Sequence, residues 1–166
     1  MEAIAMLLEP HVPALRRFAF SLTRDRDLAD DLVQVCLERA LNRWSLRHQG
    51  GHMRAWLFTI LRNLFIDHVR RVQRRGVHVA LEDASYMPVG ADQHEMGLSL
   101  RDVLAGLDSL PEDQSSAILL ISVEDLSYAD AARVLGVPVG TLMSRLSRGR
   151  EKLRTLLGDT RPPLRF

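Results

Sequence analysis

The sequence of 166 residues is poor in cysteine, tyrosine, tryptophan and glycine. Its one cysteine, Cys36, has no partner for an internal disulfide, which is typical of a protein in a reducing compartment. The scarcity of aromatic residues and glycines argues against a β-sandwich or a β-barrel, which favour aromatic strands and glycine-containing turns. No apolar run approaches the roughly 18 residues that are needed to span a bilayer. We therefore expect a helical, cytoplasmic protein without a membrane-spanning segment.

Motifs for catalysis and metal binding are also missing. The six histidines show no spacing typical of a ligand cluster, no glycine-rich phosphate-binding loop is present, and Cys36 has no evident activating partner. The N-terminal segment MEAIAMLLEP carries a glutamate where a secretory signal would carry positive charge. These absences predict a protein that is not an enzyme, is not secreted, and needs neither a metal ion nor a cofactor.

The formal net charge of +1 hides a strong segregation of charge along the chain. Residues 43–76 contain eight arginines and one acid, residues 82–130 contain eleven acids and one base, and residues 133–154 contain six bases and one acid. The net charges of these three blocks are +7, −10 and +5. Two basic blocks on either side of an acidic one predict two surfaces that bind a polyanion.

Apolar residues recur at spacings of three and four in the first half of the chain, which predicts three helices. The first begins near Val12 and ends before a charged turn at residues 23–26. Asp27 is placed to cap the second helix, which we expect to run to about Trp44. The third helix is expected over residues 53–74.

The periodicity disappears after the third helix, where proline, glycine, acids and small residues dominate. We interpret this segment as a flexible acidic linker. A second helical unit begins at Ser99-x-x-Asp102, which resembles a capping box. The fold class is therefore all-α, with two small helical domains. The predicted boundaries are 1–75 for the first domain, 76–98 for the linker, 99–160 for the second domain and 161–166 for a tail.

Two helices that meet at a tight turn are predicted within residues 127–157. Ala132 is small where the two helices approach, Gly136 permits a left-handed turn, and Leu142 anchors the second helix. This Ala-x3-Gly-x5-Leu spacing is typical of a helix-turn-helix, and the bases on its second helix suit a helix that enters the major groove. The residues predicted to contact duplex DNA are Thr141, Ser144, Arg145, Ser147, Arg148 and Arg150.

The long basic helix and the loop before it form a second candidate surface, flanked by Trp44 and Trp56. Aromatic and amide side chains beside arginines suit single-stranded nucleic acid, whose bases stack or leave the helix. Trp56 can equally anchor the core, and Asp67 can be an intrahelical partner of Arg70 or Arg71. The residues predicted to contact this strand are Arg54, Trp56, Arg62, Asn63, Asp67, Arg70, Arg71 and Arg74.

The segment ADDLVQ, residues 29–34, has adjacent acids near the start of a helix. These acids either complement the helix dipole or belong to a face that docks another protein. The residues of this predicted docking face are Asp30, Asp31, Leu32, Val33 and Gln34.

In this order, the segments resemble the extracytoplasmic-function (ECF) sigma factors, the minimal two-domain members of the bacterial sigma-70 family. ADDLVQ is similar to the segment that binds the polymerase clamp, and MRAWLFTILRNLFIDHVRR is similar to the segments that melt and read the −10 element. LSYADAARVLGVPVGTLMSRLSRGREKLR is similar to the segment that reads the −35 element as duplex. The subgroup that these segments resemble most is the alphaproteobacterial general-stress group.

The resemblance implies a sigma factor that binds core RNA polymerase through the β′ clamp and the β flap, recognises promoter DNA, and is controlled by an anti-sigma factor. Two other functions remain open at this point. The chain could be a free-standing helix-turn-helix regulator, or a sigma mimic that only titrates an anti-sigma factor. A free-standing regulator would need neither the docking segment nor the basic helix of the N-terminal half.

Overall fold

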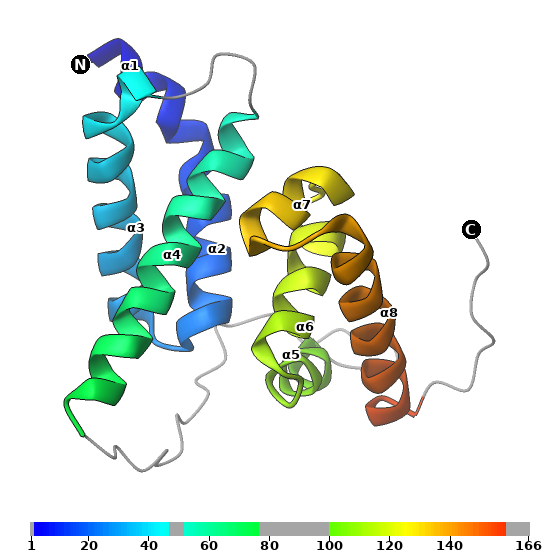
Figure 1. Ribbon diagram of the computed structural model, residues 1–166. Helices are drawn as coiled ribbons and strands as arrows, with labels where there is room; N and C mark the ends of the chain where they lie inside the picture. Colours follow the sequence, from blue (N-terminus) through cyan, green and yellow to red (C-terminus); the bar gives the residue numbers. More distant parts are fainter. Residues whose placement is uncertain (1, 47–51, 77–99, 159–166) are drawn as a thin grey trace.

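The computed structural model describes residues 2–46, 52–76 and 100–158, and no β-strand occurs in these ranges (Figure 1). The predicted all-α class with two helical units is confirmed. The predicted linker, apart from its first residue, and the whole predicted tail lie outside the described residues, and the domain boundaries stay predictions. The elements are α1 (Glu2–Leu8), η1 (Glu9–His11), α2 (Val12–Thr23), α3 (Arg26–Asn42), η2 (Trp44–Leu46), α4 (Met53–Arg74), α5 (Leu100–Asp108), α6 (Glu112–Ile118), η3 (Leu119–Val123), α7 (Tyr128–Leu135) and α8 (Val139–Leu156).

The N-terminal unit, α1 to α4, is built around the apolar stripes of α2, α3 and α4. Phe18 of α2 and Phe58 of α4 meet edge to face, with ring centroids 5.1 Å apart. Leu15 and Leu61 are almost fully buried beside them. Packing of this kind contributes about 0.5–1.5 kcal/mol per aromatic pair beyond the area it buries. The core therefore holds α4 by one face and leaves its opposite face for other contacts.

The ends of α3 differ from the sequence prediction. Asp25, not Asp27, is the cap: its backbone is extended and its carboxylate accepts a hydrogen bond from the Leu28 amide at 3.1 Å. Asp27 lies inside the first turn, where its charge complements the helix dipole. The helix also ends at Asn42, and Trp44 belongs to the short η2 turn.

The C-terminal unit, α5 to α8, has Leu120 and Leu142 at its centre, both fully buried. The predicted helix-turn-helix is present as α7 and α8. The Ser127 side chain caps α7, and Gly136 ends it with a positive φ of 65°. Helix α8 begins at Val139, and the extended Pro138 serves as its N-cap residue.

Between α6 and α7 the chain makes a π-turn, η3, that the sequence did not suggest. The Glu124 amide donates to the Leu119 carbonyl, five residues back, at 2.9 Å. Asp125 follows with a φ of 52°, a left-handed conformation that is uncommon outside glycine. Such turns are rare and often occur at functional sites.

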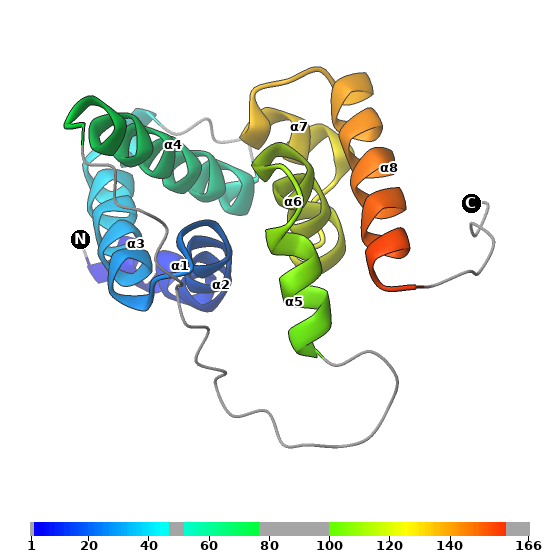
Figure 2. The same ribbon diagram turned by 90° about the horizontal axis from the view of Figure 1, so that it is seen from below.

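The two units pack directly against each other. Helix α7 lies against α4, and the α5 to α6 segment lies beside α2, as two perpendicular views show (Figures 1 and 2). The contact joins the first half of the chain to the part of the second half that is rich in acids. This packing determines which basic side chains are free to bind DNA.

Candidate nucleic-acid interface

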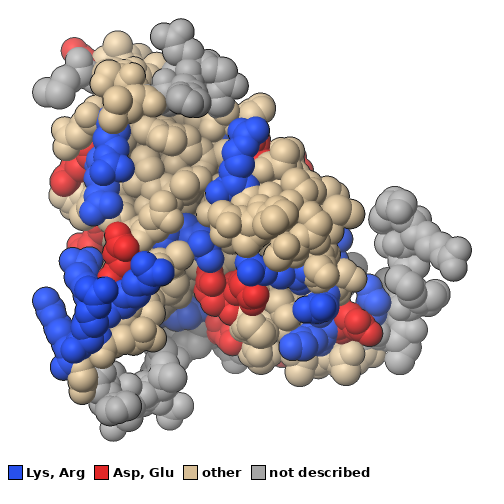
Figure 3. Space-filling model, in the orientation of Figure 1, with Lys and Arg blue, Asp and Glu red and all other residues tan. Residues whose placement is uncertain are grey.

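The C-terminal half of α4 presents the larger of the two basic surfaces. Its predicted contact residues are exposed, and Figure 3 shows basic side chains gathered at this end of the helix, at the lower left. Their spacing of three and four residues gives one continuous face. Arginines in such a row suit the phosphates of an unpaired strand. The exposed residues of this face are Asn63, Asp67, Arg70, Arg71 and Arg74.

The N-terminal half of α4 is occupied by contacts within the protein. Arg54 Nη2 lies 2.6 Å from the Glu124 carboxylate, and Arg62 Nη2 lies 3.5 Å from Glu112. Trp56 is half-buried, with its ring 6.4 Å from that of Trp44 in an edge-to-face arrangement. The structure thus divides the residues predicted for the single strand into an exposed group and a group already engaged.

Glu124 is the centre of the engaged group, and sequence analysis did not single it out. Only 2% of its side chain is exposed, and it accepts hydrogen bonds from two arginines of the other unit. Arg17 makes a bidentate contact through Nε and Nη2, both at 3.2 Å. Fork-shaped contacts of this kind are the strongest that arginine makes with a carboxylate. No motif in the sequence marks Glu124 or Arg17. The only signal that pointed to Glu124 was its place in the acidic block of residues 82–130.

The positive charge of Arg54 interacts with two neighbouring side chains, Phe58 and His11. The guanidinium lies over the Phe58 ring at 5.8 Å from the centroid, a cation–π contact that holds it in place. Burial, and then the charge of Arg54, lower the pKa of His11 below its ordinary value. His11 is therefore held in its neutral form, which adds no further positive charge beside the arginines.

Helix α8 presents the second basic surface. Ser144, Ser147 and Arg148 are exposed, and Thr141 at the helix start is partly exposed. Their spacing of three, three and one places them along one face. Leu146 is buried on the other side. Helix α8 lies on the side of the C-terminal unit away from the N-terminal unit (Figure 1).

The flanking arginines of α8 differ in their surroundings. Arg145 is about one quarter exposed, and its Nε lies 3.3 Å from the Asp113 carboxylate of α6. Arg150 is exposed, with its Nη2 3.5 Å from the Ser122 hydroxyl. The charge of Arg145 is thus partly balanced by Asp113 of its own unit, whereas Arg150 contacts a neutral hydroxyl and is exposed to solvent.

Comparison with known proteins agrees with this arrangement of two units. Residues 8–62 match the family model of the sigma2 domain of PhyR, and residues 100–153 match that of sigma-70 region 4. The chain is 45% identical over 148 residues to the ECF RNA polymerase sigma factor EcfG of Rhodopseudomonas palustris, which covers 88% of this chain and 80% of that one. The chain belongs to the ECF sigma factors.

Two solved structures extend the comparison. The sigma factor RpoE in complex with the anti-sigma factor NepR, from Bartonella quintana, is 37% identical with a TM-score of 0.85, covering 97% of this chain and all of that one. CnrH in complex with the cytosolic domain of CnrY is 26% identical with a TM-score of 0.70, covering 96% and 90%. The similarity to EcfG and to RpoE confirms the resemblance to the alphaproteobacterial general-stress subgroup. The protein is thus a promoter-directing sigma factor, in preference to a free-standing regulator or a sigma mimic.

The predicted polymerase-docking face of this sigma factor needs one correction. Asp30, Asp31 and Gln34 are exposed on α3, but Leu32 and Val33 are buried in the core of the N-terminal unit. Because successive residues of a helix point about 100° apart, no five consecutive residues share one face. Leu32 and Val33 therefore lie on the core side of α3, beneath the exposed residues of the predicted face.

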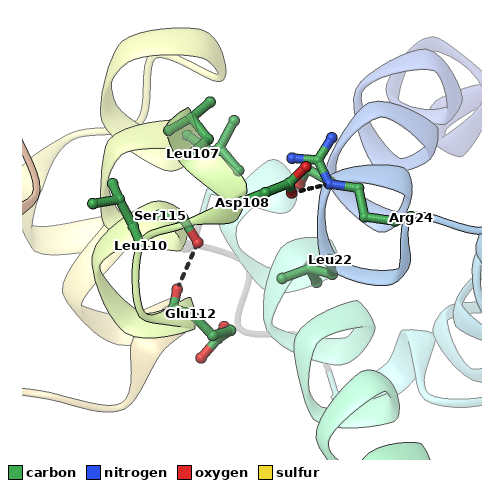
Figure 4. A pocket seen from close by; sticks show the side chains of 9 residues that line it. Leu22, Arg24, Leu107, Asp108, Leu110, Glu112 and Ser115 are labelled. Carbon is green, nitrogen blue, oxygen red and sulfur yellow. Dashed lines mark hydrogen bonds and ion pairs between the residues drawn. The ribbon is translucent and has the colours of Figure 1, made fainter. Parts of the chain in front are cut away.

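A small cleft of about 140 Å³ lies where the two units of the sigma factor meet (Figure 4). Arg24 reaches from the end of α2 to Asp108, the last residue of α5, at 2.5 Å. The leucines Leu22, Leu107 and Leu110 line the same cleft. The unit contact is therefore ionic at several points, with apolar side chains beside them.

Residues 2–46, 52–76 and 100–158 of the sigma factor contain neither a candidate metal cluster nor a candidate membrane span. No group of three or more metal-ligating side chains occurs there. None of the helices in these ranges is both long and apolar enough to cross a membrane.

Proposed function

We propose that the exposed face of α4, from Asn63 to Arg74, contacts the −10 element, and that the exposed face of α8 reads the −35 element. The observation that carries this assignment is the presence of two exposed basic faces on two separate helical units. A promoter offers two separated targets, one melted and one duplex, and each face suits one of them. The sigma factor supplies recognition and acts in the cytoplasm without catalysing a reaction itself.

We also propose that Asp30, Asp31 and Gln34 contact the polymerase clamp, and that an anti-sigma factor binds this chain. The first assignment rests on the exposure of these three side chains on one face of α3. The second rests on the similarity to RpoE, whose structure contains NepR, and to CnrH, whose structure contains a domain of CnrY.

Run-off transcription with core RNA polymerase tests the function directly. We expect transcripts to begin at promoters that carry a matched pair of −10 and −35 elements, and to be lost when either element is scrambled. A chain that binds duplex DNA but starts no transcript would instead be a free-standing regulator. A chain that starts no transcript and relieves inhibition of another sigma factor would be a mimic.

The docking face predicts the effect of Asp31→Lys on polymerase binding. An ion pair at the rim of the interface is worth under about 1 kcal/mol, whereas losing a desolvated one costs about 2–5 kcal/mol. We expect weaker competition for core polymerase by the folded variant. Glu9→Lys is the matched control, because Glu9 is an exposed acid of the same unit that lies in η1 and not on α3. Equal competition by both variants would contradict the assignment.

A further inference from the structure

The buried carboxylate of Glu124 occupies a position that a phosphate group could take. It is surrounded by Arg17 and Arg54 of the other unit, and its two oxygens together accept three hydrogen bonds from them. The Arg54 Nε atom is buried and has no hydrogen-bond partner within the described part of the chain. Arginine binds carboxylates and phosphates through the same planar fork. The guanidinium groups that bind the Glu124 carboxylate could therefore bind a DNA phosphate in the same way.

The backbone around Glu124 is shaped to present it. The π-turn of η3 and the left-handed Asp125 break the regular helix on both sides of this residue. A left-handed residue other than glycine costs about 1–2 kcal/mol. Such a conformation is kept only where surrounding contacts stabilise it. Here the surrounding contacts include those to the N-terminal unit.

A second pair repeats the pattern farther along α4. Arg62 has only 12% of its side chain exposed, and it faces Glu112 of α6. In both pairs the base lies on α4 and the acid lies in the C-terminal unit. Nucleic acid can therefore reach Arg62 fully only when the two units separate.

We infer that acidic residues of the C-terminal unit act as an internal substitute for DNA phosphates. Glu124 and Glu112 occupy Arg54 and Arg62 in the closed arrangement, by which we mean the packing of α4 against α7 with these two ion pairs formed. Closure and binding of the −10 strand then compete for the same two arginines. The inference rests on the proposed assignment of the exposed α4 face to the −10 strand, and it adds Arg54 and Arg62 to that contact when the units separate.

The test measures binding of a fluorescent single-stranded oligo(dT) to the full chain and its Glu124→Gln variant. Loss of the charge should release Arg17 and Arg54 and weaken closure, so that oligo(dT) binds about fivefold more tightly or better, within the usual range for coupled sites. The radius of gyration from small-angle X-ray scattering should increase at the same time. Asp125→Asn is the matched control, because it removes a neighbouring exposed acid and is expected to change neither quantity.

Arg17→Gln provides a second route that does not place an amide at the buried position. Arg17 is 55% exposed and lies outside the predicted DNA face, so its loss weakens closure without removing a DNA contact. Removing a positive charge would ordinarily weaken DNA binding. Tighter binding of oligo(dT) by this variant is therefore expected only if closure of the two units competes with DNA binding. The inference would be overturned if Glu124→Gln and Arg17→Gln both kept the radius of gyration of the parent chain and bound oligo(dT) no more tightly.

Arg70→Gln separates failure of this inference from failure of the proposed function. Arg70 is exposed on the α4 face and takes no part in the unit contact. If Arg70→Gln leaves oligo(dT) binding unchanged, the assignment of α4 to the −10 strand is wrong. If it weakens binding while Glu124→Gln behaves like Asp125→Asn, the assignment stands and the competition is wrong.

Discussion

The arginines of α8 differ in how freely they can contact a base. Arg145 is held by Asp113, Arg150 lies beside Ser122, and no ion pair of Arg148 occurs among the described residues. Arg148 also follows the exposed serines on the face that leads into the groove. A free guanidinium at this position can make a bidentate contact with guanine. Arg148 is thus the arginine of α8 best placed for base recognition.

This difference predicts separate outcomes for Arg148→Ala and Arg150→Ala. The first should relax preference at one base pair of the −35 element, by about 1–3 kcal/mol. The second should weaken binding to all sequences alike and reduce the slope of log K against log salt by about one. Binding to single-base variants of the −35 duplex distinguishes the two. A uniform loss from Arg148→Ala would place this residue among the phosphate contacts.

The single cysteine should be chemically inert while the chain is folded. Burial raises the pKa of Cys36 to about 12 from an ordinary value of 9.0, despite the opposing charge of Arg39. The thiolate is the reactive form, and its fraction at pH 8 should fall by about a thousandfold. We expect iodoacetamide to modify the protein rapidly in denaturant and very slowly without it. Rapid modification of the native chain would show that this core opens readily.

Gly136 and Gly140 lie four residues apart at the turn between α7 and α8 and differ in backbone conformation. Gly136 has a φ of 65°, whereas Gly140 lies in the first turn of α8 without a positive φ. Neither would bring an added Cβ within 4 Å of another atom. Any change in stability on substitution by alanine therefore comes from the backbone alone.

We expect Gly136→Ala to lower the free energy of unfolding by about 1–2 kcal/mol, the cost of a left-handed conformation. Gly140→Ala should raise it by a few tenths up to about 1 kcal/mol, because alanine favours the helix. Urea denaturation of the two variants checks both signs. Equal effects would mean that the turn adjusts its backbone when glycine is removed.

Periodicity was sufficient to predict the long helices and the helix-turn-helix, but not the elements that join them. The bounds of α4 agree with the sequence prediction because its apolar stripe is long and begins and ends clearly. The cap of α3 was misplaced because Asp25 and Asp27 are equally good caps by composition. The π-turn leaves no pattern in the sequence, so the direction of Glu124 was not predictable. Two of the five α4 arginines, Arg54 and Arg62, were consequently assigned to DNA without notice of their internal partners.

Each ion pair between the two units has at least one partly exposed member, which makes the shape of the molecule sensitive to salt. The Debye length falls from about 10 Å at 0.1 M to about 3 Å at 1 M. We expect the radius of gyration to rise over this range. The double variant Asp108→Asn, Glu112→Gln should expand at lower salt, because it lacks the pairs to Arg24 and Arg62. A radius that stays constant with salt would show that the apolar contacts suffice.

The segregation of charge along the sequence predicted two basic surfaces and an acidic block, and the block proved to lie partly within the folded C-terminal unit. What the sequence could not show is that acids of this unit lie against bases of the other. Pairing between distant segments depends on the packing of α7 against α4, which no local pattern encodes. The charge pattern is therefore informative about partners only once the fold is known.

The π-turn makes the contact of Glu124 depend on chain length as well as on charge. Each residue turns the side-chain direction of an α-helix by about 100°, and a π-turn accommodates one residue more than an α-turn. Loss of a single codon in the stretch that encodes residues 119–123 would let the helix continue regularly and would turn Glu124 away from Arg54. Every charge would remain in the encoded protein. In an alignment of related chains, a one-residue gap at this place is therefore the mark of a sigma factor whose two halves have lost this contact.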